Sequence, residues 1–235
     1  METGADTADA KGEARMVPRR GRAGSVSKAR AALQRDTCLV LKRCMDIAGA
    51  TSALLIISPI LLTTAAAVKL TSPGPVFFRQ LRVGKDGKPF YMLKFRSMHK
   101  NAEAAQAELM KYNEASGPVF KIRDDPRITP VGRFIRKYSI DELPQLWHVL
   151  VGEMSLVGPR PPIPSEVADY EDWHRRRLEV KPGLTCIWQV CGRSDVSFDE
   201  WMRMDIEYIE TRTLLLDIKL LLKTIPAVLG GRGAY

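Results

Sequence analysis

The sequence predicts a mostly helical α+β protein that is held on a membrane by one helix and carries a small β-hairpin. Residues 47–68 contain no charged side chain, and residues 76–95 hold two apolar-rich segments around a Gly-containing loop. Residues 213–229 form a further apolar segment, in which charged residues recur. The chain has 235 residues, of which 45% are hydrophobic, so it can bury a core and is too apolar to be disordered as a whole.

The net charge of +9 is concentrated around the uncharged segment. Residues 1–46 carry ten Lys or Arg against six Asp or Glu, and residues 69–100 carry eight against one. The remaining residues, 101–235, carry 18 against 20. A basic chain can bind nucleic acid or an anionic membrane. Because the excess charge flanks an apolar segment and no nucleic-acid-binding motif is present, we expect a membrane and no nucleic-acid partner.

Residues 37–70 are predicted to form a re-entrant membrane helix that is broken at Ser58-Pro59. The uncharged part is long enough to cross the hydrocarbon core. Proline in a helix removes one backbone donor and clashes with the carbonyl four residues earlier, so we expect a kink or a break here. The hydroxyl of Ser58 or a neighbouring helix can bond the freed carbonyl. Since basic residues flank both ends, the positive-inside rule favours a helix whose two ends share the cytoplasmic side. The alternative is a buried helix of a soluble core.

Two further regions are defined by composition and pattern. Residues 1–36 are rich in small and basic residues and are predicted to be a disordered basic arm. Residues 71–235 are expected to form a cytoplasmic domain. Within it, residues 76–83 and 89–95 flank the loop sequence GKDG, which predicts a β-hairpin.

Helix-forming residues predict three more helices, at 102–115, 198–210 and 213–229. The third has more Leu and Ile than one core-facing stripe requires. We therefore expect amphipathic helices that lie in the membrane interface around a cytoplasmic active site. The charged residues of the third helix should then face water: Asp217, Lys219 and Lys223.

Asp141 and Glu142 are the strongest candidates for catalysis. Neighbouring residues on a helix point about 100° apart, so two different roles suit this pair better than one shared proton. One carboxylate could attack phosphorus or hold a metal ion while the other orients it. The alternative is structural, because Ser139 and Glu142 match the S-x-x-E pattern of a helix capping box.

Basic residues surround this acidic pair in the sequence. Arg136 precedes it, Arg160 follows it in the segment GPRPP, and Lys94 lies in the second strand of the expected hairpin. Guanidinium groups match phosphate oxygens with two parallel hydrogen bonds, and a lysine supplies a point charge. The set indicates a site for a phosphorylated substrate close to a membrane.

Longer motifs connect these residues over about 190 of the 235 positions. In order they are KRCMDIAGA, the Ser-Pro pair, KLTSPGPVFFRQLRVGKDGKPF, LKFRSM, DDPRITPVGRFIRKYSIDELPQLWHVLVGEMSLVGPRPP, VKPGLTCIWQVCGRSD, MDIEYIE and LLLDIKLLLKTIPAVLGGRGAY. From about Lys42 to Tyr235 the chain resembles the minimal catalytic form of the bacterial sugar transferases. These are monotopic polyprenyl-phosphate hexose-1-phosphate transferases that initiate exopolysaccharide and other glycan assembly.

The resemblance implies a reaction and the residues that perform it. A hexose 1-phosphate would pass from a UDP-sugar to polyprenyl (undecaprenyl) phosphate through a covalent aspartyl-phosphosugar intermediate, with release of UMP. Asp141 and Glu142 would be the catalytic dyad, in which Asp141 attacks the β-phosphorus and partly holds Mg²⁺. Four basic residues would hold the diphosphate or the nucleotide: Lys94, Arg136, Arg160 and Arg193.

The resemblance also implies a location and partners. The enzyme would be a monotopic protein of the bacterial inner membrane, with the catalytic domain, residues 71–235, facing the cytoplasm. Its partners would be the UDP-sugar, polyprenyl phosphate, inner-membrane lipids, downstream glycosyltransferases and, in a homodimer, a second copy. The alternative is a catalytically inactive membrane scaffold for polysaccharide enzymes. Cys186 stands where family members usually have Gly, and Cys191 where they have Ser or Asn, and we expect both thiols to serve in packing.

Overall fold

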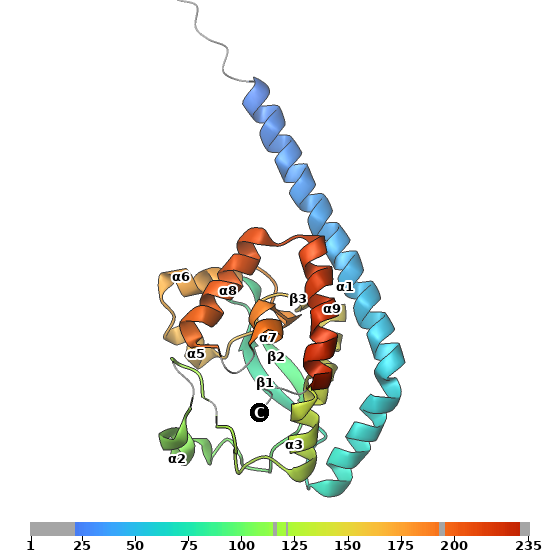
Figure 1. The fold of residues 1–235 in the computed structure, drawn as a ribbon, viewed down its shortest axis with the longest axis vertical. Helices are drawn as coiled ribbons and strands as arrows, with labels where there is room; N and C mark the ends of the chain where they lie inside the picture. Colours follow the sequence, from blue (N-terminus) through green and yellow to red (C-terminus); the bar gives the residue numbers. More distant parts are fainter. Residues whose placement is uncertain (1–21, 115–116, 121, 193–195, 231–235) are drawn as a thin grey trace, which may run out of the picture. The chain divides into compact units, whose positions relative to one another are not determined.

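Helices make up most of the structure, a computed structural model that describes residues 22–114, 117–120, 122–192 and 196–230 (Figure 1). The α-helices are α1 (Arg22–Thr71), α2 (Gln106–Leu109), α3 (Pro130–Lys137), α4 (Leu146–Val151), α5 (Pro164–Ala168), α6 (Asp172–Arg175), α7 (Ile187–Cys191), α8 (Phe198–Thr211) and α9 (Leu214–Gly230). The 3₁₀ helices are η1 (Lys85–Gly87), η2 (Met110–Tyr112), η3 (Ile140–Gln145) and η4 (Arg176–Glu179). The strands are β1 (Phe77–Val83), β2 (Pro89–Phe95), β3 (Ser155–Val157) and β4 (Gly183–Thr185). The contacts described below lie within residues 40–235, which form one compact unit.

The predicted β-hairpin is confirmed. β1 and β2 pair antiparallel, from Phe77 opposite Phe95 to Val83 opposite Pro89. The connecting loop contains η1, where Gly87 has a φ of +75°, a left-handed conformation that glycine adopts readily. Phe95 is buried, whereas every second residue of β1 is exposed. β3 and β4 form a second, parallel pair that the sequence pattern does not predict.

α1 continues without interruption through Ser58-Pro59, so the predicted break is wrong. Proline still removes a donor, and Ser58 Oγ donates a hydrogen bond of 2.9 Å to the carbonyl of Leu55, four residues before the proline. This is the compensation expected from the sequence, and it allows the helix to bend instead of ending. Figure 1 shows α1 changing direction within its cyan part. The return of both ends to one membrane face stays a prediction.

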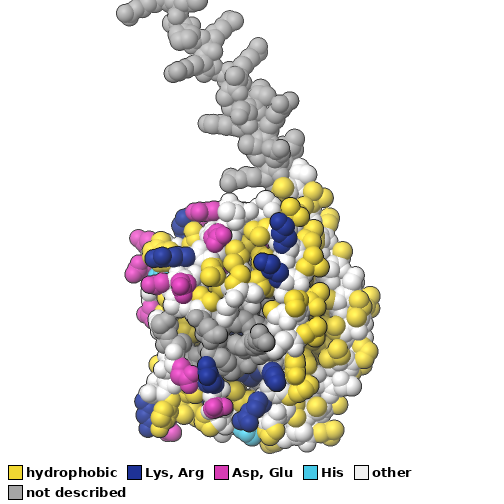
Figure 2. All heavy atoms as spheres, viewed as in Figure 1, with side chains coloured by type: hydrophobic (Ala, Val, Ile, Leu, Met, Phe, Trp, Pro, Cys, Tyr) yellow, Lys and Arg dark blue, Asp and Glu magenta, His cyan; other side chains and the backbone are white. Residues whose placement is uncertain are grey.

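The part of α1 from Thr37 to Thr71 is long and apolar enough to cross a membrane, judged by length and composition alone. Its most apolar window has a mean hydropathy of 2.0, and 11% of that window is buried. Leu55 and Ile56, for example, are 72% and 77% exposed. Figure 2 shows hydrophobic side chains along the right edge of the domain. A buried helix of a soluble core does not fit this exposure, and α1 is better explained as a membrane-associated helix.

The arm predicted at residues 1–36 overlaps the start of α1. Residues 1–21 lie outside the described residues. From Arg22 onward the chain is helical, so the prediction of disorder is wrong for residues 22–36. Residues 22–36 contain four Ala and three Arg, which favour helix. Because extension of an existing helix costs far less than nucleation, the apolar part of α1 can propagate helix into the arm.

Two basic residues of α1 bind the rest of the domain. Lys42 Nζ lies 2.6 Å from Asp217 Oδ2 of α9. Arg43 donates two hydrogen bonds of 2.6 Å, one to the carbonyl of Val149 and one to the carbonyl of Leu150, near the end of α4. The sequence suggested only that these cations mark one side of a membrane. The structure shows that they also join α1 to other helices: Lys42 to α9, and Arg43 to α4, which directly follows the candidate acidic pair.

The helices expected at 198–210 and 213–229 are confirmed as α8 and α9. α9 exposes an apolar stripe at helical spacing, formed by Leu215, Ile218, Leu222, Ile225 and Leu229. This face agrees with the expected position in the membrane interface. Asp217 was expected to face water and does not: it is 1% exposed, pairs with Lys42, and accepts a hydrogen bond of 2.8 Å from Tyr208.

The helix expected at residues 102–115 is mostly absent from the described part of that segment. Only α2, at Gln106–Leu109, and η2, at Met110–Tyr112, are helical there. Asn101, just before the segment, has a φ of +72°, and most of the side chains that follow are exposed. A short helix needs packing on one face to be stable in water. Although the residues of this segment favour helix, they are not buried, and only the short helices α2 and η2 form.

Candidate active site

Asp141 and Glu142 lie in η3, which packs against β2. Ser139, just before η3, has a left-handed backbone with a φ of +54°, and its side chain makes no capping hydrogen bond. The contact between Ser139 and Glu142 is a backbone bond of 3.2 Å from N–H to carbonyl. The capping-box interpretation is therefore wrong. A non-glycine residue with positive φ is held by its surroundings and is typical of functional sites.

Glu142 is engaged through both carboxylate oxygens. Its Oε1 lies 2.9 Å from Lys94 Nζ and 2.7 Å from Arg160 Nη2, and its Oε2 accepts a bond of 3.3 Å from Arg160 Nη1. Burial by itself would raise the pKa of Glu142, but the charges of Arg160 and Lys94 outweigh burial and hold that pKa well below its usual range. Glu142 is therefore an anion that fixes two cations.

Asp141 is in a different state although it is the next residue. Its side chain is buried, with 8% of the residue exposed. Burial and the negative charge of Glu142 raise the pKa of Asp141 to about 6, against the opposing effect of nearby cations. Among the described residues, no Lys or Arg lies within 4.0 Å of its carboxylate. In this pair the carboxylate of Glu142 is bonded to two cations, whereas that of Asp141 is available for substrate or metal.

The basic residues predicted for the site fall into three groups. Lys94 and Arg160 contact Glu142 directly, and burial lowers the pKa of Lys94 to about 8 in spite of the charge of Glu142. Arg136, in the last turn of α3, is half-buried and acts on Asp141 through its charge. Arg193 lies outside the described residues.

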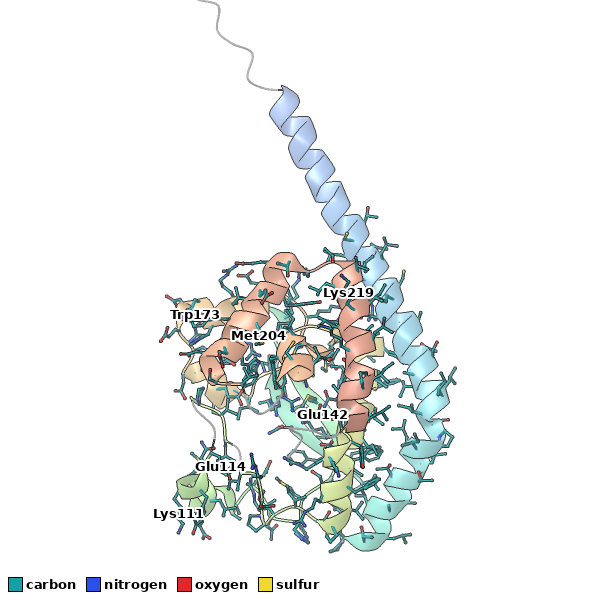
Figure 3. The ribbon with its side chains drawn as sticks, in the orientation of Figure 1. Lys111, Glu114, Glu142, Trp173, Met204 and Lys219 are labelled. Atoms are coloured by element: carbon teal, nitrogen blue, oxygen red, sulfur yellow. The ribbon has the colours of Figure 1, made fainter. Side chains whose placement is uncertain are left out.

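Figure 3 places the labelled side chain of Glu142 inside the domain, whereas Lys111 and Glu114 lie beside α2, away from it. A pocket is lined by residues on the α2 side: Leu109, Tyr112, Glu114, Ile122, Arg123, Asp124 and Pro126. Of the described residues predicted for catalysis or phosphate binding, none lines that pocket. The acidic pair and its cations thus form a separate site.

The sequence did not indicate two further arginines around the site. Arg82 of β1 donates a hydrogen bond of 2.8 Å to the carbonyl of Pro161, and Arg177 of η4 donates one of 2.8 Å to the carbonyl of Arg160. Arg177 is paired with Asp205 of α8 at 2.6 Å. The only available signal for Arg82 is the strand alternation, which places it with Gln80 on the half-buried face of β1. Arg177 stands in a run of three arginines, where no local pattern distinguishes it.

The donor set around Asp141 fits Mg²⁺ held jointly with a substrate. No group of three or more His, Cys, Asp or Glu side chains gathers within the described ranges to form a complete metal site. Mg²⁺ is commonly bound by one or two carboxylates together with substrate phosphates. Asp141 has oxygens available for this, whereas both oxygens of Glu142 are bound to cations. Asp141 is thus the residue that would hold the ion.

Cys186 fits its position without strain. Its φ of −153° and ψ of 177° are those of extended backbone, which any residue adopts. The residue is fully buried, and burial raises the pKa of its thiol well above the usual value. A buried, protonated thiol agrees with a role in packing. Cys191, in contrast, is exposed, so the packing expected of its thiol is wrong.

Comparisons with known proteins agree with the geometry. The family model described as "Bacterial sugar transferase" matches residues 37–231. The chain is 45% identical over 197 residues to the galactosyl transferase CpsE of Streptococcus agalactiae, covering 83% of this chain and 44% of that protein. It is 40% identical over 200 residues to the exopolysaccharide production protein ExoY of Sinorhizobium fredii, covering 83% and 88%. It is 44% identical over 203 residues to the undecaprenyl-phosphate galactose phosphotransferase of Salmonella typhimurium, covering 83% and 42%. The chain therefore spans less than half of two of these relatives and most of the third.

Proposed function

The chain belongs to the bacterial sugar transferase family and is an enzyme of that transferase class, and from this premise we propose its reaction. It transfers a hexose 1-phosphate from a UDP-sugar to undecaprenyl phosphate and releases UMP. The observation that carries the proposal is the division of the acidic pair: Glu142 is held by Lys94 and Arg160, while the neighbouring Asp141 has no such partner among the described residues. An inactive scaffold would not need a buried carboxylate kept free beside two phosphate-binding cations.

The first half of the reaction forms a bond between Asp141 and phosphorus. An Oδ atom of Asp141 attacks the β-phosphorus of the UDP-sugar, and the bond from that phosphorus to the bridging oxygen breaks. The bridging oxygen leaves with UMP, and the sugar phosphate stays on the carboxylate. With a pKa of about 6, Asp141 is mostly ionised at neutral pH and can act as the nucleophile.

The second half of the reaction regenerates the enzyme. A phosphate oxygen of undecaprenyl phosphate attacks the same phosphorus, the bond to Asp141 breaks, and the lipid diphosphate sugar is formed. Lys94 and Arg160, fixed by Glu142, neutralise the charge that develops on the phosphoryl oxygens in both halves. Mg²⁺, when bound by Asp141 and substrate oxygens, would supply further charge neutralisation.

The proposal extends to the location of the enzyme. α1 and the apolar stripe of α9 would hold the domain on the bacterial inner membrane, with the acidic pair on the cytoplasmic side. Undecaprenyl phosphate would then reach Asp141 by lateral diffusion, with its phosphate remaining at the depth of the lipid headgroups. The reaction would be the first membrane step of exopolysaccharide or other glycan synthesis and would feed downstream glycosyltransferases.

An exchange assay tests the covalent intermediate directly. The purified chain in detergent is mixed with Mg²⁺, an unlabelled UDP-sugar and radiolabelled UMP, without any lipid acceptor. Because a ping-pong enzyme reverses its first half-reaction alone, label should appear in the UDP-sugar. A panel of UDP-sugars identifies the hexose. Product formation with undecaprenyl phosphate but no exchange in its absence would contradict the aspartyl intermediate.

The pH dependence of the reaction should report the state of Lys94. Since its pKa is about 8, Lys94 loses its positive charge as the pH rises through that value, so kcat/KM for the UDP-sugar is expected to decline above pH 8. Lys94→Arg keeps its charge at higher pH and should move this decline upward by about one pH unit or more. Lys69→Arg, at an exposed position of α1, is the matched control and should leave the profile unchanged. An unchanged alkaline limb in Lys94→Arg would assign the decline to another group.

A further inference from the structure

Arg82 occupies a place beside the site that packing alone does not explain. β1 places Gln80 and Arg82 on its half-buried face. Arg82 Nη1 donates a hydrogen bond of 2.8 Å to the carbonyl of Pro161, next to Arg160. Its Nε and Nη2 donate bonds of 3.1 and 2.6 Å to the side-chain oxygen of Gln80. The guanidinium group is therefore held in a fixed orientation by neutral acceptors.

The charge of Arg82 has no close counter-charge. Glu142 compensates Lys94 and Arg160, but no carboxylate lies within 4.0 Å of Arg82 in the described part of the chain. Burial and the positive charge of Arg160 lower the pKa of Arg82 to about 10, so it remains a cation at neutral pH. Glu166 and Glu142 oppose this effect only at longer range. A desolvated cation beside another cation is unfavourable until an anion joins them.

The geometry of Arg82 leaves donors for such an anion. A guanidinium group has five N–H bonds, and the bonds to Gln80 and Pro161 use three of them. We propose that Arg82 is a further anion-binding residue of the site, whose remaining N–H groups donate to a phosphate oxygen of a substrate. The inference rests on the proposed function for the identity of the phosphate. That phosphate belongs either to the UDP-sugar or to undecaprenyl phosphate.

A substitution at Gln80 separates anion binding from a purely structural role. Gln80→Glu keeps the shape of the side chain and its acceptor toward Arg82, and it adds the missing negative charge. If Arg82 only holds the segment around Pro161, this variant should be at least as stable as the wild type and should bind substrate normally. If Arg82 binds a phosphate, the new carboxylate competes with the ligand. Gln80→Glu should then unfold at the same temperature as the wild type or a higher one. It should bind the phosphate-bearing substrate about tenfold more weakly than the wild type does.

Binding of UDP, measured calorimetrically on the full chain in detergent with Mg²⁺, needs no turnover and so stands apart from the proposed reaction. Arg82→Met should weaken UDP binding about ten- to hundredfold and leave uridine binding unchanged, and Arg82→Lys should recover part of the loss. The control is Arg79→Met, on the exposed face of the same strand. If UDP binding is unchanged but KM for undecaprenyl phosphate rises about tenfold or more, the bound phosphate is that of the lipid.

Two results would overturn the proposal. One is an equal loss of UDP and uridine binding in Arg82→Met, which would indicate a distorted site. The other is normal binding of UDP together with a normal KM for undecaprenyl phosphate in both Arg82→Met and Gln80→Glu. If the wild-type protein binds UDP but shows no turnover, the proposed function would be contradicted, but this role of Arg82 would not.

Discussion

Replacing Asp141 by Asn is expected to remove lipid-linked product formation and UMP exchange together, each by about 10³-fold or more. The amide is close in size to the carboxylate but cannot displace UMP from phosphorus. In the proposed mechanism both half-reactions pass through the bond between Asp141 and phosphorus, so no acceptor concentration should restore activity. The measurement is release and exchange of labelled UMP by the purified variant at saturating UDP-sugar. UDP binding should persist, since Lys94 and Arg160 keep their partner in Glu142.

Two variants make this result specific. Asp141→Ala removes the carboxylate without an amide that could hydrolyse back to it. Asp124→Asn changes an exposed aspartate of the preceding loop and should retain wild-type exchange. Exchange at a tenth or more of the wild-type rate in Asp141→Ala would place the nucleophile elsewhere, with Glu142 as the next candidate.

The features that the sequence predicted correctly are those set by neighbours along the chain. The hairpin of β1 and β2 follows from apolar strands around a glycine-containing loop, and its register runs from Phe77 opposite Phe95 to the loop. α8 and α9 follow from segments of helix-forming residues. The hydrogen bond from Ser58 to the carbonyl of Leu55 follows from the loss of one donor at the next residue. The helices and the Ser58 bond join residues within one turn of chain, and the hairpin joins two consecutive strands through one short loop.

The capping alternative at Ser139 and the exposure expected of Asp217 failed because the partners of these side chains lie on other elements of the fold. The pattern at Ser139 and Glu142 satisfies a local capping rule, yet Glu142 binds Lys94, 48 residues away, and Arg160, 18 residues away. Charge-assisted bonds in a buried site outweigh one capping bond. Asp217 was expected to face water because it interrupts an apolar helix, but Lys42, 175 residues away, neutralises it inside the domain. Local charge patterns do not reveal such pairings.

A large loss of stability is expected at the buried pair of Arg177 and Asp205. Both side chains are 1% exposed, and Arg177→Met would leave the carboxylate of Asp205 without its counter-charge. Removing one partner of a buried ion pair costs about 3–5 kcal/mol. The free energy of unfolding, measured with denaturant in detergent, should fall by about this amount. Arg176→Met removes an exposed pair with Glu210 and should cost about 1 kcal/mol or less.

The pH dependence of this loss has a definite sign. Burial already raises the pKa of Asp205 to about 6 with Arg177 present, and removing Arg177 should raise it further. A carboxyl group with a higher pKa in the folded state than in the unfolded state favours folding when protonated. The deficit of Arg177→Met should therefore shrink as the pH falls from 7 towards 5. A deficit that is constant over this range would mean that Asp205 is not the source of the penalty.

The double variant Arg177→Met/Asp205→Leu separates the stability of the domain from the placement of Arg160. Replacing both members of a buried pair by apolar residues costs less than removing one, so most of the lost stability should return. Arg177 also donates to the carbonyl of Arg160 and contacts the hydroxyl of Tyr170, and these bonds stay absent in the double variant. Recovery of the unfolding free energy without recovery of kcat/KM would show that Arg177 positions Arg160 for the reaction. Recovery of both would limit Arg177 to a role in the core.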